Sequence, residues 1–243
     1  DAVVGYTREA IGSTKYGNFE SAVLSLICSF YYLKVRWSTQ QRAEDVKFAE
    51  QESTVINTLS LPTKSPTCLT DVIISKEVFK RFGITLQLQH GNPRTISFFI
   101  GYASTIKDVV NFDESLGMDE NQNSSASLHV HGSGNQFFLC GKHREDAYVP
   151  KEFEEYENIH EYSKGPWYPF QTLPYKSPTN FHCNDQFTLL FDFEQDCVQI
   201  HHNATKAAQL SLHGEETVIP GVSIVSPDDR VKIVKYEYQF CSS

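Results

Sequence analysis

Residues 185–203 read DQFTLLFDFEQDCVQIHHN. Two runs of strand-forming residues, Thr188–Phe193 and Val198–His202, flank the polar stretch Glu194–Cys197, which has the composition of a turn. Because successive residues of a strand face opposite sides, each run can bury one side against a core. The stretch therefore predicts a β-hairpin within a β-rich domain.

The same period of two recurs along the chain. Residues 82–88 alternate apolar and polar side chains, whereas residues 96–102 (ISFFIGY) are apolar on both faces and indicate a strand in the middle of a sheet. Further strands are predicted at 128–130, 136–139, 222–225 and 231–240. The apolar phase of the last strand changes near Ile233–Val234, which predicts a β-bulge. Short strands with no helical pattern between them predict a mainly β fold, an antiparallel two-sheet sandwich.

The first 60 residues follow another pattern. Apolar residues recur there at steps of four and three, as along the seam of an α-helix: Phe19, Val23, Leu26, Phe30, Leu33 and Trp37. Pro62 and Pro66 break any helix, so we expect a helical segment at 1–60 and the sandwich at 61–243. Two roles of the helix stay open, namely packing on its own domain and joining subunits of a homo-oligomer.

Composition and charge exclude several classes of protein. The 243 residues carry 21 Lys and Arg against 30 Asp and Glu, a formal net charge of −9, which disfavours nucleic-acid binding. The most apolar run, Val23–Val35, is too short to span a membrane, and no basic secretory start precedes it. The six cysteines form no C-x-x-C pair, which favours a reduced, cytoplasmic protein. Sequons at Asn123 and Asn203 leave secretion open.

Two long loops interrupt the strand rhythm, at 103–127 and 141–180. Loops of this length in a compact domain are usually functional or disordered, and the second one is rich in aromatic residues and acids. Hot spots of protein interfaces are enriched in Trp and Tyr, so we expect Trp167 and Tyr168 to anchor a partner. The candidate partner-binding residues are Tyr148, Phe153, Tyr156, Trp167, Tyr168 and Tyr175. The acids would attract a basic partner, although Trp167 could instead plug the sandwich edge and the acids could form a solvated face.

The order of motifs in the C-terminal third resembles that of a known family. Asp185–Glu194 and Val198–Asn203 are followed by Ile219–Ile224 (IPGVSI) and then Asp229–Val234 (DRVKIV). This series is similar to the end of SPRY (B30.2-like) domains, and the loose match extends over about residues 70–240. Upstream contributions to the resemblance are Gly83–Leu88, Ile96–Tyr102 and Ser127–Gly141.

The chain departs from the SPRY pattern in three places. Leu86-Gln87 stands where the family has Trp-Glu, Asn184-Asp185 where it has Gly-Asp, and Ala204 where it has a glycine after Asn203. The resemblance implies a bent, concanavalin-like sandwich without catalytic residues. It also implies that loops at one end bind a peptide or folded partner, often as the targeting part of an adaptor or ubiquitin ligase.

Other functions have weaker support in the sequence. Asp192 and Glu194 lie two residues apart, as paired carboxylates of a glycoside hydrolase do, but Leu190 stands where a third carboxylate would be expected. Non-catalytic sugar binding and a purely architectural subunit are further alternatives. His129 and His131 share a strand face, yet two histidines are fewer than a zinc site requires. The sequence therefore predicts no catalytic residue, no metal site and no cofactor.

Overall fold

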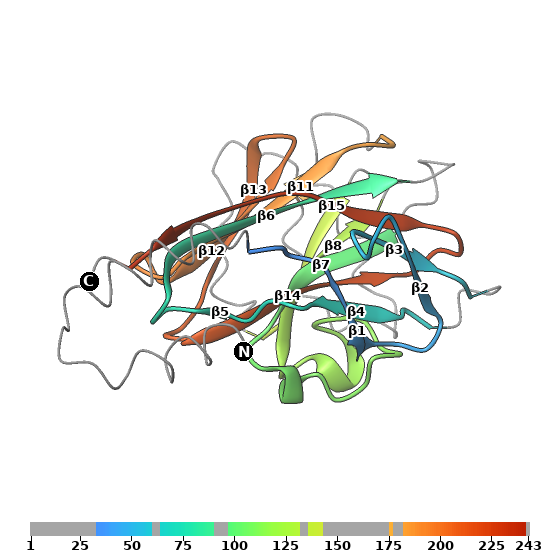
Figure 1. Ribbon diagram of the computed structural model, residues 1–243, viewed down its shortest axis with the longest axis horizontal. Helices are drawn as coiled ribbons and strands as arrows, with labels where there is room; N and C mark the ends of the chain where they lie inside the picture. The colour runs from blue at the N-terminus through green and yellow to red at the C-terminus, as the bar shows by residue number, and fades with distance from the viewer. Residues whose placement is uncertain are drawn as a thin grey trace.

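The computed structural model describes residues 33–59, 64–89, 97–131, 136–142, 175–176 and 182–241. Two antiparallel β-sheets lie face to face within these residues (Figure 1). Sheet A has the order β1-β4-β14-β7-β8-β9-β10, with β5 paired to β14, and sheet B has the order β13-β12-β11-β6-β15-β3-β2. The prediction of an antiparallel two-sheet sandwich is confirmed.

The strands of sheet A are β1 (Trp37–Arg42), β4 (Thr67–Thr70), β5 (Ile74–Ser75), β7 (Ser97–Ala103), β8 (Ser125–His131), β9 (Gln136–Gly141), β10 (Tyr175–Lys176) and β14 (Thr217–Ile224). The strands of sheet B are β2 (Val46–Ala49), β3 (Thr54–Asn57), β6 (Phe79–Gln89), β11 (Gln186–Asp192), β12 (Cys197–His202), β13 (Thr205–Ser211) and β15 (Arg230–Phe240). Two short 3₁₀ helices, η2 (Ile106–Asp108) and η3 (Asp119–Asn121), lie between β7 and β8.

The main core fills the space between the two sheets. Phe98 of β7 packs edge-to-face on Phe187 of β11, with ring centroids 5.2 Å apart, and Tyr102 packs in the same way on Phe191 at 5.6 Å. All four rings are at most 2 % exposed. Aromatic pairs in this geometry contribute about 0.5–1.5 kcal/mol beyond the burial of their area. Strands β7 of sheet A and β11 of sheet B are therefore joined by direct ring contacts.

The strands predicted from alternation are confirmed. The hairpin of β11 and β12 pairs Phe191 with Val198 and Asp192 with Cys197, and β7 lies between β14 and β8 in the middle of sheet A. The register of β15 against β6 shifts between Ile233 and Lys235, where the bulge was predicted. The strands that were not predicted are β1, β2, β3, β4, β5, β10 and β13.

The helical prediction for residues 1–60 is wrong where the structure describes it. Residues 37–57 form β1, β2 and β3, and Trp37 lies in a strand with 1 % of its surface exposed. Its indole N–H donates to the carbonyl oxygen of Ser53 at 3.0 Å. Because β1 pairs with β4 and β3 with β15, these residues are part of the sandwich. Residues Phe19, Val23, Leu26 and Phe30 lie outside the described residues, and Leu33 packs, partly buried, against the main core.

The sandwich has two ends, which we name after a residue at each. The Asn57 end holds the turns β1–β2, β12–β13 and β14–β15. The Glu215 end holds the turns β11–β12 and β13–β14 and the connection between β7 and β8. Among the residues that the structure describes, no helix has the length and apolar character needed to cross a membrane.

The loop predicted at 103–127 is a cover over sheet A. Its residues Val109 and Leu116 are buried against Leu69 and Ile219, in a second small core on the outer face of the sheet. The sheet also binds the backbone of this cover: the hydroxyl of Ser223 in β14 accepts the N–H of Leu116 at 2.9 Å. This part of the chain is therefore structural, whereas its length alone suggested a functional loop.

Asn121 holds this cover together and allows a test. Its side chain is fully buried; its Oδ1 accepts from the N–H of Val110 at 2.9 Å, and its Nδ2 donates to the carbonyl oxygen of Asn111 at 2.8 Å. Because Asn121→Ala leaves these buried groups without partners, we expect it to lower the free energy of unfolding by about 2–3 kcal/mol. Urea denaturation measures this, with the exposed Asn123→Ala as control. An equal effect of both variants would contradict the assigned role.

Candidate functional site

The predicted partner-binding residues lie mostly outside the described part of the chain. This applies to Tyr148, Phe153, Tyr156, Trp167 and Tyr168. The backbone of Tyr175 is described, and in β10 it pairs with Phe137 of β9. The aromatic segment thus leaves β9 at the Glu215 end and rejoins the sheet near the opposite end of the same strand.

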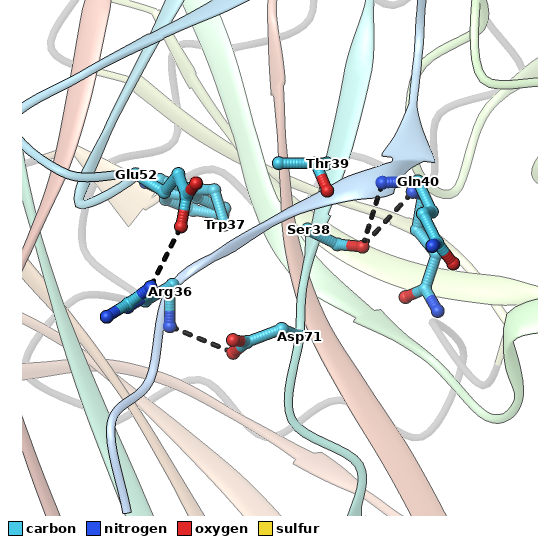
Figure 2. A pocket seen from close by; sticks show the side chains of 8 residues that line it. Arg36, Trp37, Ser38, Thr39, Gln40, Glu52 and Asp71 are labelled. Atoms are coloured by element: carbon cyan, nitrogen blue, oxygen red, sulfur yellow. Dashed lines mark hydrogen bonds and ion pairs between the residues drawn. The ribbon is translucent and has the colours of Figure 1, made fainter. Parts of the chain in front are cut away.

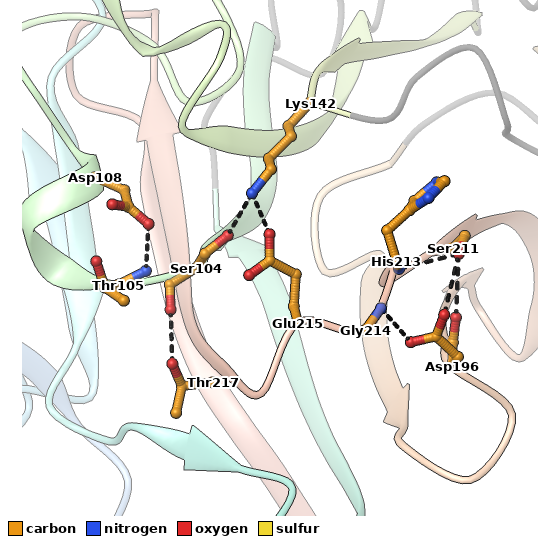
Figure 3. A network of polar contacts seen from close by, with 10 residues as sticks. All are labelled: Ser104, Thr105, Asp108, Lys142, Asp196, Ser211, His213, Gly214, Glu215 and Thr217. Carbon is orange, nitrogen blue, oxygen red and sulfur yellow. Dashed lines mark hydrogen bonds and ion pairs between the residues drawn. The ribbon is translucent and has the colours of Figure 1, made fainter.

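The start of that segment is tied to the Glu215 end by a polar network (Figure 3). The ammonium group of Lys142 forms an ion pair with Glu215 and donates to the hydroxyl of Ser104 at 3.3 Å. The hydroxyl of Thr217 donates to the carbonyl oxygen of Ser104 at 3.0 Å. Lys142 follows β9, Ser104 follows β7, and Glu215 lies between β13 and β14. The network therefore joins the chain segments that follow three different strands.

A second part of Figure 3 links the neighbouring turns. Oδ1 of Asp196, in the β11–β12 turn, accepts the backbone N–H of Gly214 at 2.8 Å, and Ser211 donates to Oδ2 at 3.4 Å. The β11–β12 and β13–β14 turns are thereby held together. The Glu215 end is therefore a polar surface whose connections are fixed to each other.

A pocket of about 290 Å³ lies beside β1, in the part of the chain that the structure describes (Figure 2). Polar side chains from β1, the β2–β3 turn and the residue after β4 form most of its wall. The lining residues are Arg36, Trp37, Ser38, Thr39, Gln40, Gln41, Glu52 and Asp71. Sequence reasoning missed this pocket, since most of its lining lay within the predicted helical segment.

Arg36 connects the two acidic residues of the pocket. Its guanidinium Nη1 lies 3.1 Å from Oε2 of Glu52, and its backbone N–H donates to Oδ1 of Asp71 at 2.9 Å. Burial raises the pKa of Asp71, and the hydrogen bonds from the backbone of Arg36 and of Asp71 itself offset this only in part. The site therefore holds a carboxylate whose negative charge is poorly solvated.

An unusual turn forms one wall of the pocket. Glu50, Gln51 and Glu52 have φ values of 52°, 57° and 66°, in the left-handed region that residues other than glycine rarely adopt. The turn is held by its surroundings, because the carbonyl oxygen of Glu52 accepts the N–H of Trp37 at 2.9 Å and Lys232 pairs with Glu50 at 2.5 Å. Backbone strain of this kind costs about 1–3 kcal/mol per residue and tends to occur at functional sites.

The carboxylates considered for a hydrolase have separate structural roles. Asp192 is 2 % exposed, accepts from Nε of Arg81 at 2.7 Å, and accepts the backbone N–H groups of Glu194 and Gln195 at 3.1 and 3.0 Å. Glu194 lies in the turn and pairs with Lys80 at 2.7 Å. Asp192 is therefore a turn-capping carboxylate, and the geometry gives no support to a catalytic pair.

Asp185 is likewise structural. It accepts from the Nδ2 of Asn203 at 2.8 Å and from the backbone N–H of His182 at 2.8 Å, and it lies 3.0 Å from Nε2 of His202. Burial alone would raise the pKa of Asp185, but these hydrogen bonds lower it on balance. Within the described residues, no group of three or more His, Cys, Asp or Glu side chains could hold a metal ion.

Comparisons with known proteins identify the fold. Neither a protein-family profile nor a curated protein sequence matches the chain. Among solved structures, the TRIM65 PSpry domain aligns with a TM-score of 0.55 and 8 % identity, covering 88 % of this chain and 99 % of that domain. The SPRY domain of human HERC1 aligns with a TM-score of 0.52 and 10 % identity, covering 82 % and 97 %. The chain has the SPRY-type fold.

The predicted resemblance is thus confirmed at the level of the fold. A carbohydrate-binding module, CBM66 from Bacillus subtilis, also aligns, with a TM-score of 0.42 and 12 % identity, covering 83 % of this chain and 94 % of that module. Asn184 and Ala204 replace glycines of the SPRY sequence pattern. Their φ values are 77° and 71°, so both positions have the left-handed backbone that favours glycine. Asparagine tolerates this region better than alanine does.

Proposed function

We propose that the chain is a non-enzymatic interaction module that binds a peptide or a folded protein partner. The observation that carries this proposal is the SPRY-type sandwich, which aligns with nearly the whole length of two SPRY domains. SPRY domains bind their partners through loops at one end of the sandwich, and the resemblance implies the same for this chain. We propose further that the chain is cytoplasmic and acts as the targeting part of a larger adaptor or ubiquitin ligase.

Within this proposal, Trp167 and Tyr168 anchor the partner. They follow Lys142 in the sequence, and the polar network holds Lys142 itself at the Glu215 end. The neighbouring acids would steer a basic partner. Helix-mediated homo-oligomerisation through Phe19, Val23, Leu26 and Phe30, the predicted seam residues outside the described part of the chain, is a separate proposal.

A peptide selection tests the proposed function. The bait is the full chain, because residues 37–57 form strands of the sandwich and a fragment starting at residue 61 would lack them. Peptides selected from a displayed random library are measured by fluorescence polarisation. A hot-spot residue contributes about 2 kcal/mol or more, a factor of about 30, and the effects of neighbouring hot spots do not simply add. Trp167→Ala/Tyr168→Ala is therefore expected to weaken binding of the selected peptide about 30-fold or more.

The control variant is Val110→Ala, which removes apolar surface at an exposed residue of the cover. Its affinity should match that of the wild type, and thermal unfolding of all variants verifies their folding. Equal peptide affinity of the double variant and the wild type would place the site elsewhere. Selection of no peptide, together with glycan-array binding that free sugar releases, would overturn the proposal in favour of a carbohydrate-binding module.

A further inference from the structure

We propose that the pocket beside β1 binds a cationic side chain, a lysine or an arginine of a peptide partner. The proposal rests on the proposed function in one respect, since it names a class of partner for a peptide-binding module. It concerns a surface distinct from Trp167 and Tyr168. The occupant is inferred from the charges and acceptor atoms of the pocket (Figure 2).

The pocket offers acceptor atoms of negative charge. Arg36 contacts Oε2 of Glu52 and Oδ1 of Asp71, and within the described residues neither carboxylate has a further side-chain hydrogen bond, so both can accept from N–H donors of a ligand. Two carboxylates against one guanidinium give the pocket a formal charge of −1. Charge-assisted hydrogen bonds from an ammonium or guanidinium group are stronger than those between neutral groups. The pocket therefore favours a cation over a neutral or anionic side chain.

The rest of the lining suits a peptide rather than a bare metal ion. Thr39, Gln40 and Gln41 contribute a hydroxyl and two amide groups, which can both donate to and accept from peptide groups. In β1, Thr39 and Gln40 are exposed, so a chain lying along this edge strand can reach them. The volume of about 290 Å³ is close to the lower limit of known ligand pockets, about 300 Å³, and suits one long side chain.

The walls of the pocket are fixed before any ligand binds. The carbonyl oxygen of Glu50 accepts from both the N–H and the hydroxyl of Ser53, at 3.3 and 2.8 Å, which closes the left-handed turn. The indole of Trp37 binds the carbonyl oxygen of the same Ser53. A preformed site loses little entropy on binding. In addition, a bound cation would stabilise the ionised form of Asp71, whose pKa burial raises.

The test uses a small probe and the full chain. In ¹H–¹⁵N NMR spectra, Nα-acetyl-arginine amide is titrated against the indole signal of Trp37, which Trp167→Phe distinguishes from the second tryptophan. Nα-acetyl-citrulline amide has nearly the same shape without the charge. We expect a saturable shift with the arginine probe and a much smaller one with the citrulline probe. Equal shifts with both probes, or no saturable shift with arginine, would overturn the proposal.

Two carboxylate variants locate the binding. Asp71→Asn should weaken the arginine probe by about tenfold or more, because it removes the charge from the acceptor. Glu237→Gln, an exposed carboxylate of β15 that does not line the pocket, should leave its affinity unchanged. Equal affinity of Asp71→Asn and the wild type would overturn the assignment. Probe binding together with a failed peptide selection would support the pocket and contradict only the proposed peptide-binding function.

Discussion

Replacing Gly141 by alanine is expected to lower the free energy of unfolding by roughly 2–5 kcal/mol. A Cβ atom at this position would lie 2.1 Å from the carbonyl oxygen of Ser125 and 2.6 Å from the Cα atom of Gly117. Both are backbone atoms, which cannot rotate away as a side chain can. The φ value of 84° adds strain, because the left-handed region costs about 1–2 kcal/mol for an alanine and overpacking costs about 1–3 kcal/mol.

Gly214→Ala provides the matched control. Gly214 has a similar φ value of 75°, but a Cβ atom there would meet nothing within 4 Å, so only the backbone strain of about 1–2 kcal/mol applies. Urea denaturation measures the free energy of unfolding of both variants, provided that its dependence on urea concentration has the same slope in each. The difference between the two variants is then the cost of the atomic overlap at Gly141, because the backbone strain is common to both. If Gly141→Ala lowered the free energy of unfolding no more than Gly214→Ala does, this would contradict the close approach of the cover to sheet A.

The close approach at Gly141 could not be predicted from the length and composition of the segment 103–127. Gly117 of the cover lies against β8 and β9, and a Cβ atom on it would be 2.7 Å from the hydroxyl of Ser127. The sequence shows isolated glycines and an acidic stretch here, and only the pairing of the strands places these glycines opposite each other. Contacts between distant segments of this kind leave no periodic signal in the sequence.

Strands that bury one face were predictable from the sequence. In β6, Phe82, Ile84 and Leu86 alternate with smaller or polar residues and are at most 1 % exposed. The bulge in β15 was predictable as well, because a one-residue change of register exchanges the two faces of a strand. Strand β4 gave no such signal, since its four residues are all buried and include two threonines.

The first strands and the pocket could not be predicted by the same reasoning. Trp37 lies four residues after Leu33, a spacing that fits the apolar seam of a helix. In the structure, the hydrogen bond from its indole to Ser53 and its pairing with Thr70 hold it in β1. The left-handed turn at Glu50–Glu52 contains no glycine or asparagine, the residues from which such a turn is predicted. Tertiary contacts thus outweighed the local pattern.

Asp229→Asn is expected to change the pH dependence of stability, because Asp229 is a buried carboxylic acid. Its side chain is fully buried in the turn between β14 and β15, and the N–H of Asn57 donates to its carbonyl oxygen at 3.1 Å. Burial raises the pKa of Asp229 from 3.8 to about 7; the hydroxyl of Ser226 opposes this, and the charge of Asp228 adds to it. The native state therefore holds a proton that the unfolded chain releases near pH 4.

The sign of the effect follows from this difference in proton binding. Below pH 4 both states are protonated, so Asp229 makes no pH-dependent contribution to stability. Between about pH 4 and 7 the native state binds more protons than the unfolded state, so stability falls as the pH rises. Above pH 7 the loss is complete, and a shift of about three pH units corresponds to roughly 4 kcal/mol. An asparagine cannot ionise and therefore removes this loss.

The stability of Asp229→Asn relative to the wild type should accordingly rise by several kcal/mol between pH 4 and pH 8. Urea denaturation at steps across this range measures the difference, and its change with pH is decisive, because a constant offset reflects only the fit of the amide. Glu237→Gln is the control, since it removes one negative charge from an exposed residue of β15 that does not contribute to the raised pKa of Asp229. A difference that does not vary with pH would show that Asp229 has the same pKa in the native and the unfolded state, and that the turn at the Asn57 end accommodates its charge.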